Sequence, residues 1–176
     1  MRRGVGVVLA GLAYLLLIAQ ATAATPRPLV ATVARVTDGD SVVAVTATGT
    51  KLRVRLLGID APELPHNGKP GQPYAEEARD YLDHLIGGKT VRIEAYGPDQ
   101  YKRILAVLWD GRVNVNLLMV AMGYAEVYRG ALCQAYCEDL FRTEVQAKRD
   151  KVGMWAQGSQ YESPAAFRRR MRLSGN

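Results

Sequence analysis

Three runs rich in β-branched residues follow one another near the start of the chain. They are LVATVARV (29–36), SVVAVTA (41–47) and KLRVRLLGI (51–59). The Thr-Gly-Thr sequence at 48–50 is a turn signal, and runs of this kind separated by short turns are typical of consecutive antiparallel strands. The sequence therefore predicts that residues 29–59 form a β-meander, and the fold must contain a sheet.

The third run indicates how this sheet is oriented. Its apolar residues Leu52, Val54 and Leu56 alternate with Arg53 and Arg55. Because successive side chains of a strand point to opposite faces, the apolar residues share one face and the arginines share the other. One face of the predicted sheet therefore carries guanidinium groups.

The rest of the chain alternates between helices and strands. We expect a Pro- and Gly-rich loop at 64–73 and then a helix from Tyr74 that ends at Gly87-Gly88. The later expected elements are strands at 89–96 and 101–109, a helix between Asn114 and Gly123, and a helix at about 138–151. Five short strands favour a five-stranded Greek-key barrel of the OB type over a sandwich, which needs about seven strands. The predicted class is α+β, an OB-fold barrel with three helices.

The first residues have the layout of an export signal. Residues 1–23 start with two arginines, continue into an apolar run and end in small residues, as cleavable signal peptides do. The apolar run is short for a membrane span, and an uncleaved N-terminal anchor is the alternative. Cleavage removes two arginines and no acid, so the formal charge of +6 becomes +4. A basic chain is compatible with a polyanionic partner, although many exported proteins are basic without one.

We expect one domain at 24–157 and a basic tail at 158–176. The expected protein is secreted or periplasmic, is monomeric, and has no stable membrane insertion once its signal is removed.

Two carboxylates are expected to meet at one edge of the barrel. Asp38, Gly39 and Asp40 precede the second strand, and Asp60 follows the third. Asp-Gly-Asp alone is also an ordinary turn sequence. Adjacent strands lie about 5 Å apart, so Asp40 and Asp60 can approach each other. Carboxylates, a free backbone carbonyl and water are the oxygen ligands that a hard cation such as Ca²⁺ prefers, so the pattern predicts a site for a hard cation.

Arginines and a further acid accompany this carboxylate pair. Arg55 lies on the third strand, Arg103 lies at the start of the fifth, and Glu63 begins the Pro- and Gly-rich loop. Arginine binds phosphate oxygens through its planar fork. A cation and two guanidiniums can stabilise charge on a phosphate while a spare carboxylate accepts a proton from water. The combination predicts cleavage of phosphodiester bonds.

Several motifs, taken in order, resemble those of the staphylococcal nuclease (thermonuclease) family over residues 29–155. They are VTDGDSV, RLLGIDAPE, DQYKR, VNVNLLMVAMGYAEVY and EVQAKRDKVGMW. The resemblance implies an OB-fold barrel with three helices and Ca²⁺-dependent hydrolysis of DNA and RNA. That reaction breaks the P–O5′ bond and leaves 3′-phosphate ends.

The resemblance also implies roles for individual residues. Asp40 and Asp60 correspond to the family's Ca²⁺ carboxylates, with the backbone carbonyl of Ala61 as a further ligand. Arg55 and Arg103 correspond to its phosphate-binding arginines. Further correspondences are Glu63 with the proposed general base and Asp38 with an acid that shapes the turn and orients water near the ion.

Three residues are candidates for substrate binding. Tyr101 and Tyr128 can stack on bases, and packing at the rim of the core is the alternative for both. Lys102 is the third candidate, and it stands where the family usually has glycine. Gln100 replaces a residue that is usually basic in the family.

The two cysteines, Cys133 and Cys137, are expected to form a local disulfide because an exported protein meets oxidising conditions. Two free thiols and metal ligation are the alternatives. Neither His66 nor His84 supports metal ligation, since neither has a second ligand at a suitable spacing.

The tail SPAAFRRRMRLSGN carries a cluster of arginines at positions 168, 169, 170 and 172. It is either a solvated end of the chain or an additional contact with the nucleic-acid backbone through phosphate charge. For the whole chain, the functional alternative is a non-catalytic oligonucleotide-binding module. Such a module would be expected to lack some of the five residues proposed for chemistry, and the sequence contains them all.

Overall fold

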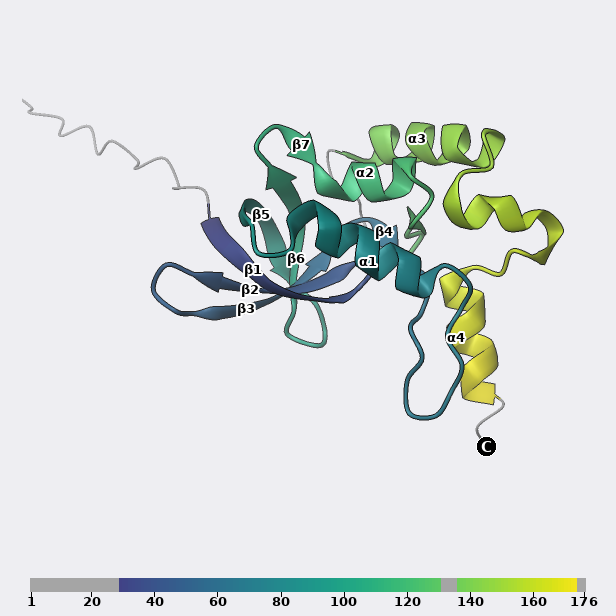
Figure 1. Ribbon diagram of the computed structural model, residues 1–176, viewed down its shortest axis with the longest axis horizontal. Helices are drawn as coiled ribbons and strands as arrows, with labels where there is room; N and C mark the ends of the chain where they lie inside the picture. The colour runs from purple at the N-terminus through teal and green to yellow at the C-terminus, as the bar shows by residue number, and fades with distance from the viewer. Residues whose placement is uncertain (1–28, 131–135, 174–176) are drawn as a thin grey trace, which may run out of the picture.

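The computed structural model describes residues 29–130 and 136–173. Five strands form its barrel: β1 (Leu29–Asp38), β2 (Ser41–Thr46), β3 (Lys51–Leu56), β5 (Thr90–Pro98) and β6 (Ile104–Asp110). They pair in the order β3-β2-β1-β5-β6, and a parallel pairing of β3 with β6 closes the sheet (Figure 1). The predicted five-stranded OB-fold barrel of the α+β class is therefore confirmed.

Alternation along the strands separates the core from the outer face of the barrel. Val33, Ala44 and Val54 from the three meander strands are buried in one apolar cluster. Arg53 and Arg55 occupy the alternate positions of β3, with Arg53 exposed and Arg55 half-buried. The outer face of β1, β2 and β3 is therefore the face that carries guanidinium groups.

The three predicted helices are present near their expected positions. They are α1 (Ala75–Ile86), α2 (Val115–Ala121) and α3 (Cys137–Arg149). The Asn114 side chain caps α2 by accepting the N–H of Leu117 at 3.0 Å, as expected for an N-cap asparagine. Short strands complete the fold: β4 (Ile59–Asp60) pairs with β8 (Glu126–Val127), and β7 (Val113–Asn114) extends the main sheet.

The helix count of three is wrong for the described residues, which contain two further helices. A 3₁₀ helix spans Gly153–Gln160 and α4 spans Pro164–Leu173, so the supposed basic tail is folded. Proline suits the first turn of a helix, and the hydroxyl of Ser163 accepts the N–H of Ala166 at 3.2 Å. Phe167 is buried and anchors α4. Pro164, Phe167 and Met171 give only a short apolar stripe among the arginines, so the sequence pattern did not predict the helix.

Helix α4 lies beside the loop that leads from β4 to α1 (Figure 1). The Lys69 ammonium of that loop donates to the carbonyl of Met171 at 2.7 Å, and the Gln72 side chain donates to the carbonyl of Glu162 at 3.0 Å. Helix α4 is therefore brought to the edge of the barrel where this loop leaves β4.

Some expectations fall outside the described residues. The proposed signal peptide lies there, and so does Cys133, whereas Cys137 begins α3. The disulfide between the two cysteines stays a prediction. Within residues 29–130 and 136–173, no helix has the length and apolar character needed to cross a membrane.

Candidate active site

Asp40 ties the β1–β2 turn to the end of β4. Its side chain is buried, with 1% of the residue exposed. One carboxylate oxygen accepts the backbone N–H of Ala61 at 2.9 Å, and the other accepts the hydroxyl of Ser41 at 2.9 Å. Two motifs that are separated in the sequence therefore meet through a single carboxylate.

Gly39 is needed at this junction because of close packing. A Cβ atom at position 39 would lie 2.7 Å from the Cβ of Ala61 and 2.8 Å from the Cβ of Ala78 on α1. The φ angle of Gly39 is not in the left-handed region. Asp-Gly-Asp thus forms the expected turn. The glycine is required mainly because Ala61, just after β4, and Ala78 of α1 pack closely against it, and less because of the turn conformation.

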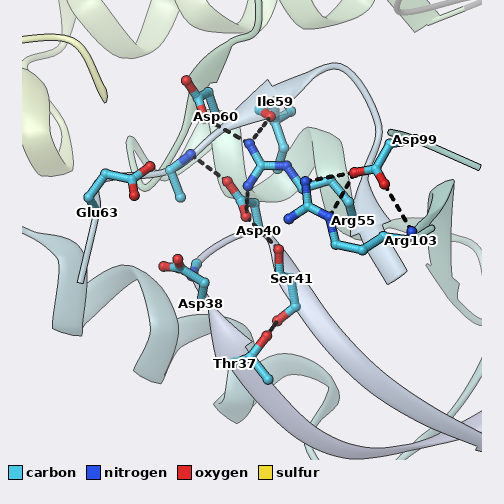
Figure 2. A network of polar contacts seen from close by, with 12 residues as sticks. Thr37, Asp38, Asp40, Ser41, Arg55, Ile59, Asp60, Glu63, Asp99 and Arg103 are labelled. Carbon is cyan, nitrogen blue, oxygen red and sulfur yellow. Dashed lines mark hydrogen bonds and ion pairs between the residues drawn. The ribbon is translucent and has the colours of Figure 1, made fainter. Parts of the chain in front are cut away.

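Arg55 lies between the two carboxylates that were predicted to meet. Its Nη2 donates to Asp60 Oδ1 at 2.7 Å, and its Nη1 forms an ion pair with Asp40 Oδ1 (Figure 2). Asp60 is fully buried, with 0% of the residue exposed. Burial alone would lower the pKa of Arg55, but the charges of Asp40 and Asp60 outweigh that effect and raise it. The guanidinium is therefore permanently charged between two buried acids.

Asp38 carries less negative charge than the sequence suggests. Burial, followed by the charges of Asp40 and Glu63, raises the pKa of Asp38 to about 7. Its Oδ1 accepts the N–H of Gly39 at 2.9 Å, which partly opposes this rise. A proton on Asp38 near neutral pH reduces the repulsion within the acidic cluster.

Glu63 stands at the mouth of the site, and its backbone is held by Gln72. The N–H of Glu63 donates to the Gln72 side chain at 2.9 Å, and its carbonyl accepts the N–H of Gln72 at 2.8 Å. The two residues close the base of the Pro- and Gly-rich loop. The Glu63 side chain stays 30% exposed, so its carboxylate can reach water.

Arg103 is held by Asp99 and does not contact the site carboxylates. Its Nε donates to Asp99 Oδ2 at 2.7 Å, while Asp99 Oδ1 accepts the N–H groups of Tyr101 and Arg103. Arg103 immediately precedes β6, which pairs with β3, and Figure 2 shows it on the same rim as Arg55. The structure thus places both predicted arginines together but gives them different acidic partners.

The three candidate substrate-binding residues, Tyr101, Lys102 and Tyr128, are all exposed. Tyr101 is 62% exposed and Tyr128 is 37% exposed, so neither tyrosine is packed into the core. The guanidinium of Arg103 lies 5.4 Å from the ring centroid of Tyr101. Lys102 has a φ of 59°, the left-handed conformation for which glycine is favoured, so the backbone keeps the shape that glycine would adopt.

Arg168 of α4 is a site residue that the sequence did not single out from its neighbours. Its Nη2 donates to Asp60 Oδ2 at 2.7 Å, and its Nη1 donates to Asp60 Oδ1 at 3.0 Å and to Glu63 Oε1 at 2.5 Å. The pKa of Arg168 is raised, since bonds to Asp60 and Glu63 outweigh the opposing effect of burial. The only advance signal was Ser-Pro before a lone phenylalanine, which marks a helix start but not where the helix docks.

The donor set suits a hard cation. Asp40 and Asp60 flank one guanidinium, and the backbone N–H of Ala61 donates to Asp40, so the two carboxylates and the backbone of Ala61 lie close together. Oxygen ligands of this kind are those that Ca²⁺ prefers. Across the described residues, no three or more His, Cys, Asp or Glu side chains form a metal-binding group. Two carboxylates would therefore need backbone and water oxygens to complete the shell.

The closed barrel and its rim of arginines and buried acids define an OB-fold protein with a polar site at one edge. Residues 53–157 match the family described as Staphylococcal nuclease homologue, and the chain belongs to that family. The match ends before α4, so Arg168 lies outside it.

Curated relatives carry the name "Probable endonuclease LCL3". The protein from Clavispora lusitaniae is 40% identical over 134 residues, covering 70% of this chain and 58% of the relative. The protein from Candida albicans (strain SC5314) is 42% identical over 125 residues, covering 67% of this chain and 53% of the relative. The chain thus spans between half and three fifths of the length of these relatives.

Proposed function

We propose that this protein is a Ca²⁺-dependent nuclease that hydrolyses DNA and RNA at the P–O5′ bond and leaves 3′-phosphate ends. The observation that carries the proposal is the position of Arg55 between Asp40 and Asp60, with Glu63 and Arg103 on the same rim. Membership of the family and the names of the relatives support nuclease activity. The Ca²⁺ requirement and the bond that breaks rest on the resemblance and on the oxygen donors.

Asp40, Asp60 and the carbonyl of Ala61 would hold the ion. When bound, Ca²⁺ supplies positive charge against the charge that develops on the phosphate oxygens. Arg55 is oriented by the same two acids, and its guanidinium would exchange part of these ion pairs for phosphate oxygens when substrate binds.

The remaining steps belong to Glu63 and Arg103. The half-buried Glu63 carboxylate accepts a proton from water as the water oxygen bonds to phosphorus, and O5′ leaves with the electron pair of its bond and takes up a proton from solvent. Arg103 donates to the phosphate from the other side of the rim. Tyr101 and Tyr128 offer faces for base stacking, and Lys102 offers an additional cation.

We further propose that the protein acts after export, as a secreted or periplasmic monomer. The layout of residues 1–23 supports the export step. A bridge between Cys133 and Cys137 would suit that environment, and alkylation of the mature protein without reductant, followed by mass spectrometry, tests it.

Digestion of a labelled oligonucleotide by the purified protein, with Ca²⁺ or with excess chelator, tests the main proposal. We expect cleavage only with Ca²⁺, and fragments that a polymerase extends only after a phosphatase removes their 3′-phosphates. Equal cleavage in chelator would contradict the Ca²⁺ requirement, whereas fragments with 3′-hydroxyl ends would contradict the proposed bond. An Arg112→Ala variant, altered on an exposed turn, serves as the control.

A further inference from the structure

A groove with a volume of about 390 Å³ runs along the outer face of the barrel from the candidate active site. Its lining includes Asp38, Ser41 and Arg103, and it also includes Arg35 and Arg53. The family resemblance assigned no role to these last two arginines.

Strand register places Arg35 and Arg53 on one row across the sheet. Arg35 of β1 pairs with Val43 of β2, and Val43 pairs with Arg53 of β3. Two residues further along β3 is Arg55, on the same face. Alternate residues of a strand are separated by about 7 Å, so this row lies one step beyond the guanidinium of the candidate active site.

The two arginines differ from the others on this face because their charges are uncompensated. Arg55 pairs with Asp40 and Asp60, and Arg103 pairs with Asp99. In the described part of the chain, neither Arg35 nor Arg53 has an acidic partner, and both are exposed. Two like charges facing each other across one valine repel, and a polyanion lying between them would relieve that repulsion.

We propose that Arg35 and Arg53 bind phosphates next to the scissile one, so that the groove carries a polynucleotide strand away from the site. This inference rests on the proposed function. Guanidiniums that contact only phosphates add affinity without reading the base sequence, and they make binding depend on salt. The exposed ring of Tyr101 beside Arg103 provides a face on which a base of the same strand can stack.

The test compares Arg35→Ala/Arg53→Ala with a control of the same charge change, Arg112→Ala/Arg149→Ala, whose residues are exposed outside the groove. Binding of a fluorescent single-stranded 12-mer is measured by anisotropy in chelator at several salt concentrations. We expect the groove variant to bind about tenfold more weakly, with a salt slope reduced by about 0.7 for each phosphate that an arginine no longer neutralises. A dinucleotide is too short to reach the groove. The rate at which the groove variant cleaves a dinucleotide in Ca²⁺ should therefore stay within about twofold of the wild-type rate.

Equal binding of the 12-mer by the groove variant and its control would overturn the groove assignment. A loss of dinucleotide cleavage as large as the loss of 12-mer binding would overturn it as well. Failure of the wild type to cleave either substrate would instead contradict the proposed function, while the binding measurement would still decide the role of the groove.

A different observation carries a second inference, which concerns Arg168. Asp60 Oδ1 accepts from both Arg55 and Arg168, and Asp60 Oδ2 accepts from Arg168. The same guanidinium reaches Glu63 Oε1. A single side chain from α4 therefore contacts both a proposed cation ligand and the proposed base.

The attachment of α4 is small enough to be reversible. Only Pro164 and Phe167 of this helix are buried, and a cavity of about 300 Å³ remains between α4 and the loop that begins at Glu63. The bond from Lys69 to Met171 adds to the ion pairs of Arg168 in holding the helix to that loop. Release of α4 would therefore expose two buried side chains of this helix, Pro164 and Phe167.

The geometry points to direct competition: Arg168 neutralises Asp60 in place of the cation, so Ca²⁺ binding and docking of α4 through Arg168 exclude each other. A guanidinium that engages both oxygens of a buried carboxylate leaves that carboxylate poorly able to ligate, and it repels a second cation. The docked helix would hold the enzyme inactive until Ca²⁺ displaces Arg168. This inference also rests on the proposed function.

Calorimetric titration with Ca²⁺ tests it on the full chain, with Arg168→Ala and Arg168→Gln compared to Arg169→Ala. Arg169 is an exposed arginine on the same helix and is the matched control. We expect both Arg168 variants to bind Ca²⁺ about tenfold more tightly than the wild type, and Arg169→Ala to match the wild type within about twofold. Amide hydrogen exchange across α4 of the wild type should speed up when Ca²⁺ is added.

The competition proposal would be overturned, and the proposed Ca²⁺ site would stand, if both Arg168 variants had the Ca²⁺ affinity of the wild type. The same would follow if the rate of amide exchange across α4 did not change when Ca²⁺ is added. Absence of Ca²⁺ binding in every variant would overturn the competition and the proposed Ca²⁺ site together.

Discussion

The Asp40 carboxylate accepts the backbone N–H of Ala61 at 2.9 Å, joining residues separated by 21 positions in the sequence. This bond fixes the end of β4 against the β1–β2 turn, and the other oxygen of Asp40 faces Ser41 and Arg55. The residue is therefore part of both the fold and the proposed chemistry. Its replacement should have separable effects on stability and on Ca²⁺ dependence.

Asp40→Ala should raise the Ca²⁺ concentration needed for half-maximal cleavage, because one proposed ligand is lost. The defect should shrink as Ca²⁺ is added, which a titration of cleavage rate against Ca²⁺ measures. Asp80→Ala, on the exposed face of α1, is the control and should behave as the wild type. A rate reduced by the same factor at every Ca²⁺ concentration would argue against ligation by Asp40.

Gly39→Ala should destabilise the fold, because the new methyl would overlap Ala61 and Ala78. Overpacking of this kind costs about 1–3 kcal/mol. The shift of the urea unfolding midpoint measures it. A variant as stable as the wild type would show that β4 and α1 can move apart at no cost.

Lys102→Gly should stabilise the protein by up to about 1 kcal/mol, because Lys102 has a left-handed backbone that disfavours a side chain. Lys51→Gly is the matched control. It lies in the extended strand β3 and should cost about 0.5–1 kcal/mol. Urea unfolding of both variants measures the difference. Destabilisation by Lys102→Gly would mean that side-chain contacts outweigh the backbone strain.

Glu94 should contribute a stability that depends on pH. Partial burial alone would raise its pKa, but hydrogen bonds from Tyr96, Tyr136 and Trp109 outweigh burial and lower the pKa from its ordinary value of 4.5. A lowered folded pKa stabilises the protein above the unfolded pKa, and this stabilisation disappears as pH falls through the folded pKa. Glu94→Gln should therefore cost about 1 kcal/mol at pH 7 and progressively less as the pH falls through the folded pKa. Thermal unfolding across this range checks it, and a cost independent of pH would contradict it.

Local pattern was sufficient to predict the meander and the approach of Asp40 and Asp60, which both contact Arg55. Adjacent antiparallel strands bring one strand's start beside its neighbour's end, so period-two alternation and a turn signal carry most of that information. The arginine face of β3 followed from the same alternation.

Contacts made by docking could not be predicted in this way. Arg168 reaches Asp60 across 108 positions because the buried side chains of Pro164 and Phe167 seat α4. Nothing in the run FRRR distinguishes that arginine from its neighbours. Arg103 was placed on the correct rim, but its pairing with Asp99 depends on a tight turn around a left-handed Lys102, which sequence periodicity does not encode.

Turnover of Arg55 variants tests the central claim most directly, because Arg55 joins the two buried carboxylates to the proposed phosphate site. At saturating Ca²⁺, with folding checked by circular dichroism, we expect Arg55→Ala to lower the turnover number on single-stranded DNA by about 100-fold. DNA affinity should stay within about threefold. Arg55→Lys should recover only part of the rate, since a point charge does not reproduce the planar fork. Turnover of Arg55→Ala within about twofold of the wild type, equivalent to only about 0.4 kcal/mol, would contradict the proposed role.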